Sequence, residues 1–187
     1  MKIGDVEVFQ LAWAPGDPPA QRSAWVRVLG EDGNFGIGEA SPMQGGLASL
    51  GIVARDLKPL LIGADPLDHA VLHDTMLHRF AKLGPEGALS GALAAVDIAL
   101  WDLKGKLLRQ PIYKLLGGAW RTELPFYASI GGNGERSVDE VVRVVEARLG
   151  DRPAAVKIRF DNDRTKPDLD IPGDIAKARA VRRLVGD

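Results

Sequence analysis

Hydrophobic and polar positions alternate over the first forty residues, and this period of two is typical of β-strands. Val6 and Val8 alternate with acidic residues, which predicts a strand over residues 2–11. The same pattern predicts two further strands, over residues 23–29 and 35–40. A Gly-Asn pair before the last strand supplies the chemistry of a hairpin turn. We therefore expect a three-stranded antiparallel meander.

Helical spacing replaces this alternation in the next sixty residues. Apolar positions predict a first helix over residues 47–62. Asp65 as an N-cap before Pro66 predicts the start of a second helix that runs to about Phe80. Apolar residues recur at alternating spacings of four and three over residues 89–107. This regular apolar stripe predicts one long helix. Small residues beside this stripe would let a neighbouring element approach closely.

From about residue 124, short apolar strands alternate with amphipathic helices. Strands are predicted over residues 125–130 and 154–160, and helices over residues 137–149 and 173–185. Ser137 and Glu140 have the spacing of a capping box. A β-α-β-α order is typical of a parallel sheet or a (β/α) barrel. We expect an α+β domain over residues 1–122 and an incomplete α/β domain over residues 123–187, because two βα units cannot close a parallel sheet and a barrel needs eight strands.

Composition limits the possible functions. The 187 residues include 24 Lys and Arg and 25 Asp and Glu, a formal charge of −1, so we expect no nucleic-acid partner and no anionic membrane partner. The lack of cysteine excludes disulfides and thiolate metal sites. No apolar run approaches the roughly 18 residues of a membrane span, and the acidic start differs from a secretory signal. We therefore expect a cytoplasmic protein.

The most informative candidate site lies in the last predicted strand. Lys157 and Arg159 share one strand face because side chains at i and i+2 point the same way. The apolar residues between and beside them point toward the covering helices. In a barrel, two cations would then face the interior, which is costly unless an anion meets them. A solvated strand face is the alternative interpretation of this pair.

Three other patterns have ordinary structural explanations. The glycines of residues 36–41 begin like a dinucleotide fingerprint, but the closing glycine is absent and the segment ends an antiparallel hairpin. His69 and His73 stand at i and i+4, which predicts exposed helix histidines rather than a metal site, because no third ligand is visible. Asp97 and Asp102 are predicted to be caps or ion-pair partners.

Three stretches together resemble the enolase superfamily, specifically its mandelate racemase/muconate lactonizing enzyme branch. Residues 36–40 are similar to the strand that leads into a substrate-capping loop of that family. Residues 95–106, with the exit segment 111–118, resemble the family's hallmark helix almost residue for residue. Lys157 and Arg159 stand where the family carries its Lys-x-Lys motif, at the end of the second barrel strand.

The resemblance implies an α+β capping domain followed by a modified (β/α)7β barrel. Family members hold the carboxylate of a small-molecule substrate on Mg²⁺, remove its α-proton with a base and stabilise the enediolate on the metal. The metal ligands are expected beyond residue 187, so we expect no bound metal and no activity from this chain alone. The resemblance also implies a homo-oligomer in the full-length form.

Arg159 departs from the family's pattern, in which the second lysine of the motif is the usual base. Arginine stays protonated in proteins and is a poor base. Either Lys157 acts as the base, or Arg159 binds and polarises the substrate while the base comes from the opposite wall. A racemase needs an acid or base on both faces of the carbon. We therefore favour an acid-sugar dehydratase over a racemase, epimerase or cycloisomerase of the same superfamily.

Loops of the capping domain select the substrate in this family, and residues 12–22 and 41–47 are the matching segments. Trp13, Arg22 and Met43 are the candidate substrate-binding residues, with ordinary surface-loop residues as the alternative. A different class of function also stays open. The chain could be a capping module without catalytic activity that binds a partner, although an unpaired barrel strand would favour aggregation.

Overall fold

A computed structural model describes residues 1–13, 21–40, 46–84, 86–160 and 170–186 of the chain. The chain divides into two compact units, residues 1–119 and residues 120–187. Each unit is described by itself. No helix in these described ranges has the length and apolar character needed to cross a membrane.

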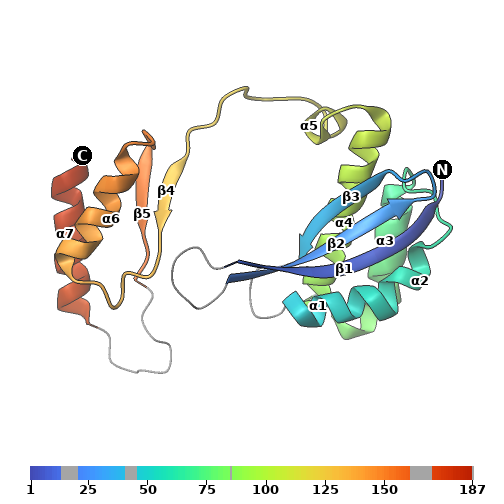
Figure 1. The fold of residues 1–187 in the computed structure, drawn as a ribbon, viewed down its shortest axis with the longest axis horizontal. Coiled ribbons are helices and arrows are strands. Elements are labelled where there is room, and N and C mark those ends of the chain that lie inside the picture. The colour runs from blue at the N-terminus through green and yellow to red at the C-terminus, as the bar shows by residue number, and fades with distance from the viewer. Residues whose placement is uncertain (14–20, 41–45, 85, 161–169, 187) are drawn as a thin grey trace. The chain divides into compact units, whose positions relative to one another are not determined.

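The first unit opens with a three-stranded antiparallel sheet, as the alternating pattern predicts (Figure 1). Its strands are β1 (Ile3–Trp13), β2 (Gln21–Gly30) and β3 (Phe35–Ala40), in the order β1-β2-β3. Val6 pairs with Val28 across β1 and β2, and both are buried. Strands β1 and β2 are longer than predicted, because their pairing continues to Trp13 opposite Gln21. The predicted loop 12–22 is therefore shorter at both ends.

Helices follow the sheet and cover it. They are α1 (Gly46–Ile52), the π-helical turn η1 (Val53–Leu57), α2 (Lys58–Leu61), α3 (His69–Arg79), the 3₁₀ turn η2 (Ala81–Leu83), α4 (Ala88–Leu108) and α5 (Ile112–Leu115). The predicted helix 47–62 is therefore interrupted by a π-helical turn. Pro59 is the second residue after that turn, and its missing N–H disfavours an ordinary α-helical bond there.

The predicted helix start at Asp65 is wrong. The Asp65 carboxylate accepts the backbone N–H of Leu67 at 2.8 Å, and its carbonyl accepts that of Asp68 at 3.1 Å. This local turn competes with helix formation, as short acidic side chains often do. Helix α3 consequently begins at His69.

Two glycines of β3 let α4 lie directly on the sheet. A Cβ atom at Gly38 would overlap the carbonyl oxygen of Ala95 and lie 2.8 Å from the amide nitrogen of Ala99. A Cβ at Gly36 would overlap the Ala99 carbonyl in the same way. The glycines therefore serve close helix–sheet packing, which agrees with the prediction that they form no nucleotide site.

A hydrogen bond of Asp102 also fastens α4 to β3. Its carboxylate accepts the backbone N–H of Ile37 at 2.9 Å and the Lys106 ammonium at 2.7 Å. Because Ile37 stands between the two glycines, this bond lies at the closest part of the helix–sheet contact. The predicted ion-pair role of Asp102 is confirmed.

The second unit contains two parallel strands, each followed by a helix. The elements are β4 (Tyr127–Ile130), α6 (Val138–Leu149), β5 (Ala155–Ile158) and α7 (Ile171–Val185). Strands β4 and β5 pair in parallel, and both helices lie on one side of them (Figure 1). Both predicted βα units are confirmed. Ile130, Val141, Val145 and Val181 form the buried cluster between the strands and helices.

The predicted capping box begins α6. Ser137 Oγ accepts the N–H of Glu140 at 3.3 Å, and the Glu140 carboxylate accepts the N–H of Ser137 at 2.8 Å. The hydrogen bonds from Ser137 hold the pKa of Glu140 below its ordinary value. At the start of α7, Asp170 accepts the N–H of Gly173 at 3.0 Å.

Replacing Gly38 with alanine should destabilise the first unit by about 1–3 kcal/mol, because the added methyl group meets backbone atoms that must move. Gly51→Ala in α1 is the matched control, since nothing lies within 4 Å of a Cβ there. That change should be neutral or stabilise by up to about 1 kcal/mol. Urea unfolding followed by tryptophan fluorescence measures both, and equal effects would contradict the close contact.

The capping box should make the stability of the second unit depend on pH. A lowered pKa for Glu140 means that its contribution is present above the unfolded value of about 4.3 and is lost as the pH falls through the folded value. Glu140→Ala should therefore destabilise the chain at pH 7 and have a smaller effect near pH 3. Urea unfolding at both pH values tests this, with Glu146→Ala on the exposed face of the same helix as control.

Candidate functional site

The cation pair lies on the sheet face that the helices do not cover. Lys157 and Arg159 are exposed, whereas Val156 and Ile158 are half-buried against the apolar cluster of α6 and α7. The alternation of β5 thus separates charge from packing, as expected for a strand with one buried face. Both cations stand at the carboxyl end of β5, where parallel strands commonly carry functional groups.

Residues of β4 share this face with the cations. Ser129 is the register partner of Lys157, and Tyr127 pairs with Ala155. Both Ser129 and Tyr127 are exposed, and the Lys157 ammonium lies 5.9 Å from the centroid of the Tyr127 ring. The face therefore combines fixed positive charge with a hydroxyl and an aromatic ring, groups that suit a carboxylate attached to a hydroxylated carbon chain.

A buried asparagine joins the carboxyl ends of the two strands. Asn133 Nδ2 donates to the carbonyl of Ile130 at 2.8 Å and to that of Arg159 at 2.9 Å. The N–H of Arg159 also donates to the Ile130 carbonyl, at 3.0 Å. Sequence reasoning missed Asn133. The available signal was a polar residue within the Gly-rich segment directly after a predicted strand.

Lys177 of α7 is buried although it is charged. Its ammonium donates to the carbonyls of Asn133 at 2.9 Å and Gly134 at 3.1 Å, and lies 3.7 Å from the Asp174 carboxylate. These contacts compensate the cost of removing the charge from water. This residue was also missed, because a lysine in an amphipathic helix is ordinarily assigned to the solvent face.

The predicted capping-loop residues belong to the first unit. The backbone of Trp13 ends β1, and that of Arg22 pairs with Ala12 near the start of β2, so both stand at the same end of the hairpin. Met43 lies outside the described residues. The substrate-binding role of these three residues stays a prediction.

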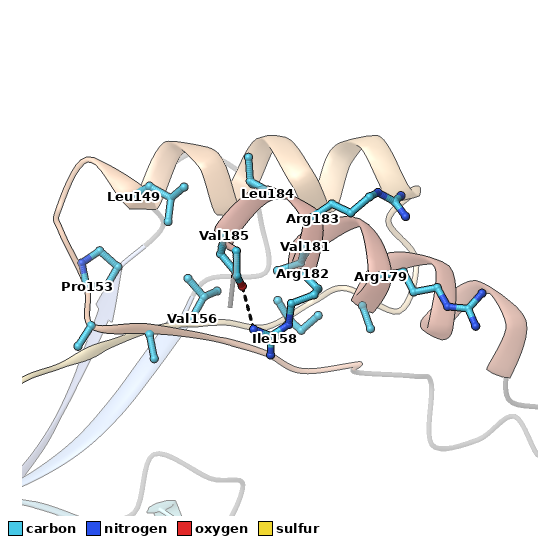
Figure 2. Close-up of a pocket in the computed structure, with 14 residues that line it drawn as sticks. Leu149, Pro153, Val156, Ile158, Arg179, Val181, Arg182, Arg183, Leu184 and Val185 are labelled. Atoms are coloured by element: carbon cyan, nitrogen blue, oxygen red, sulfur yellow. Dashed lines mark hydrogen bonds between the residues drawn. The ribbon is translucent and has the colours of Figure 1, made fainter.

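A groove of about 930 Å³ lies on the other side of β5, between the strand and the helices (Figure 2). Val156 and Ile158 point into it from β5, and Leu149 and Val181 line it from α6 and α7. Because Lys157 is on the opposite strand face, the groove is separate from the candidate site, and Arg179, Arg182 and Arg183 of α7 also line it.

A second polar cluster lies between α3 and α4. His69 Nε2 and His73 Nδ1 lie 2.7 and 2.9 Å from the same carboxylate oxygen of Asp97. The His69 ring centroid lies 4.4 Å from that of Trp101, and its side chain is only 12% exposed. The prediction of an exposed helix histidine is therefore wrong for His69, because the two helices enclose it. Asp97 is therefore a shared hydrogen-bond partner of the two histidines, which is a structural role.

Carboxylates do not gather at the candidate site. Within the described ranges, no group of three or more His, Asp or Glu side chains has a geometry that could hold a metal ion. The open face of β4 and β5 carries Lys157 and Arg159, which repel a divalent cation. The described residues therefore do not fit a Mg²⁺ ion.

Comparison with known families decides the classification. Residues 9–117, more than half of the chain, match the model described as "Mandelate racemase / muconate lactonizing enzyme, N-terminal domain". The chain belongs to this family. The match includes β2, β3 and α4, so the glycine-mediated helix–sheet contact lies within the family's N-terminal domain.

Relatives extend the likeness beyond that domain. A mandelate racemase/muconate lactonizing protein from Paracoccus denitrificans, solved with magnesium, is 67% identical with a TM-score of 0.89, over 99% of this chain and 49% of its own. The D-xylonate dehydratase of Haloferax volcanii is 38% identical, over 85% of this chain and 36% of its own. The 3,6-anhydro-alpha-L-galactonate cycloisomerase of Streptomyces coelicolor is 33% identical, over 87% of this chain and 43% of its own. The chain thus spans half or less of each relative's length.

Proposed function

We propose that this chain is part of a Mg²⁺-dependent enzyme that removes the α-proton of a sugar-acid carboxylate and dehydrates the acid. In this proposal, residues 1–122 form the capping domain and residues 123–187 form the start of the barrel. The observation that carries the proposal is the cation pair at the carboxyl end of β5, on an open sheet face, in a member of the mandelate racemase family. The D-xylonate dehydratase relative supports dehydration.

Each cation has a distinct role in the proposed reaction. Lys157, in its neutral form, accepts the proton from the carbon next to the carboxylate. The hydroxyl of the neighbouring carbon leaves as water with a proton from a general acid, and the resulting enol tautomerises to a 2-keto acid. Arg159 remains protonated, so it binds the substrate carboxylate with paired hydrogen bonds and does not act as a base.

Magnesium enters the proposal only for the longer protein. A relative has been solved with magnesium, but the described residues of this chain do not fit the ion. Arg159 supplies positive charge to the substrate independently of any metal. The proposal also includes a cytoplasmic location and a homo-oligomeric full-length form.

Cycloisomerisation is the second candidate function, because one relative is an anhydrogalactonate cycloisomerase. Both reactions begin with α-proton removal from a sugar acid. They differ in the later step, because cycloisomerisation conserves the atoms of the substrate whereas dehydration releases water. Product mass therefore separates them.

A fusion protein tests the proposed function. Residues 1–187 are joined to the remaining half of the Paracoccus denitrificans relative, whose 67% identity over this chain favours correct folding. With Mg²⁺ and a panel of sugar acids that includes D-xylonate, the fusion should release a product lighter by one water molecule. A product of unchanged mass would favour the cycloisomerase. No turnover and no α-proton exchange in D₂O would favour a capping module without catalytic activity.

Lys157→Met in this fusion should lower kcat by at least about 100-fold, the usual contribution of a general base. Lys114→Met is the matched control, since Lys114 is also exposed and lies 5.7 Å from the ring centroid of Tyr113. It should leave kcat unchanged. If Lys157→Met retained α-proton exchange in D₂O at the original rate, the base would instead come from the opposite wall.

A further inference from the structure

Both N–H groups and the oxygen of the Asn133 side chain are hydrogen-bonded at the strand ends. Its two N–H groups meet the carbonyls of Ile130 and Arg159, and its Oδ1 accepts from the Arg136 guanidinium at 3.0 Å. Reversing the amide would place Oδ1 against two carbonyl oxygens, so the hydrogen-bond network fixes its orientation. Asn133 is completely buried, and water cannot replace these bonds without a rearrangement.

Lys177 and Arg136 in turn hold the segment that carries Asn133. The Lys177 ammonium binds two consecutive carbonyls, those of Asn133 and Gly134, from the neighbouring helix α7. Arg136 donates to the carbonyl of Gly131 at 2.8 Å, across the same turn. A continuous chain of contacts therefore runs from α7 through the turn to the backbone of Arg159.

We propose that Asn133 and Lys177 are positioning residues that act through the Arg159 carbonyl to fix Arg159, and Lys157 two residues earlier, at the site. This inference rests on the proposed function for the roles of the two cations. Four apolar residues make up the buried cluster of the second unit, and β5 has only four residues. The bond from Asn133 fixes the backbone just beyond the last residue of β5, where apolar packing from the strand has ended.

Amide hydrogen exchange in the 187-residue chain provides the first test. Asn133→Ala should speed exchange of the Arg159 N–H about tenfold, because it frees the strand end, and should leave the N–H of Val145 in α6 within twofold. Lys177→Met should also speed exchange of the Arg159 N–H. It provides a second test of the same contact if Asn133→Ala does not fold. Arg179→Met, at an exposed position of the same helix as Lys177, should leave the exchange rates of both the Arg159 and the Val145 amides unchanged.

Val145→Ala separates positioning from general stability. Val145 is fully buried in the apolar cluster, so this change weakens the whole unit without touching the Asn133 contacts. It should speed exchange of the protected amides together. If Asn133→Ala gave this uniform pattern, or left Arg159 unchanged, the positioning role would be overturned.

The fusion protein provides a second test of the same inference. Asn133→Ala should lower kcat/KM by about 10- to 100-fold, because small misplacements of binding groups are costly. In an Arg159→Met background the same change should have a smaller further effect, since the part of its effect that passes through Arg159 is already lost. Val145→Ala, assayed below its unfolding temperature, should leave kcat/KM within twofold.

The outcomes distinguish the two proposals. If the unaltered fusion is inactive while exchange at Arg159 responds selectively to Asn133→Ala, the proposed function fails and the positioning of Arg159 stands. If the fusion is active and the effects of Asn133→Ala and Arg159→Met are fully additive, the positioning inference fails and the proposed function stands.

Discussion

The backbone of α4 lies against β3 at a separation that only glycine permits. Gly36 and Gly38 are two residues apart on the strand and face carbonyls of Ala99 and Ala95, four residues apart on the helix. A spacing of two on a strand and of four on a helix each return to the same face, so the contact repeats along both elements. The Asp102 carboxylate then bonds to the strand between the glycines. The core of the first unit depends on this contact, because α4 supplies many of its buried residues.

The second unit is held together differently. Its buried apolar cluster is small, and a buried polar network centred on Asn133 supplements it. Such a network is directional, whereas apolar contact is not, so it specifies the position of a strand end better than packing alone. The network requires the burial of Lys177, which is unfavourable by itself. Two carbonyls and the nearby Asp174 carboxylate offset the loss of water around the ammonium group.

Periodicity predicted most elements of the fold because one face of each predicted strand and helix packs against a neighbouring element. The meander, the long helix and the two βα units follow directly from that principle. Asp65 was misread because an N-cap and a local turn use the same acidic side chain before the same proline. His69 was misread because the pattern of apolar residues within one helix does not show which other helix will pack against it and cover the histidine. Contacts between elements that are distant in sequence, such as Asn133 with Arg159, leave no periodic signal at all.

In the proposed function, arginine at position 159 determines what the site can do. Arg159 carries a permanent charge, so it can hold an anion at every physiological pH but cannot take a proton. Its orientation therefore matters more than its protonation, since a planar guanidinium binds a carboxylate well only when the two planes align. A lysine at the same position would tolerate a looser backbone, because an ammonium group is a compact charge on a flexible stem. A backbone fixed at the carbonyl of residue 159 is consequently a physical complement to arginine at that position.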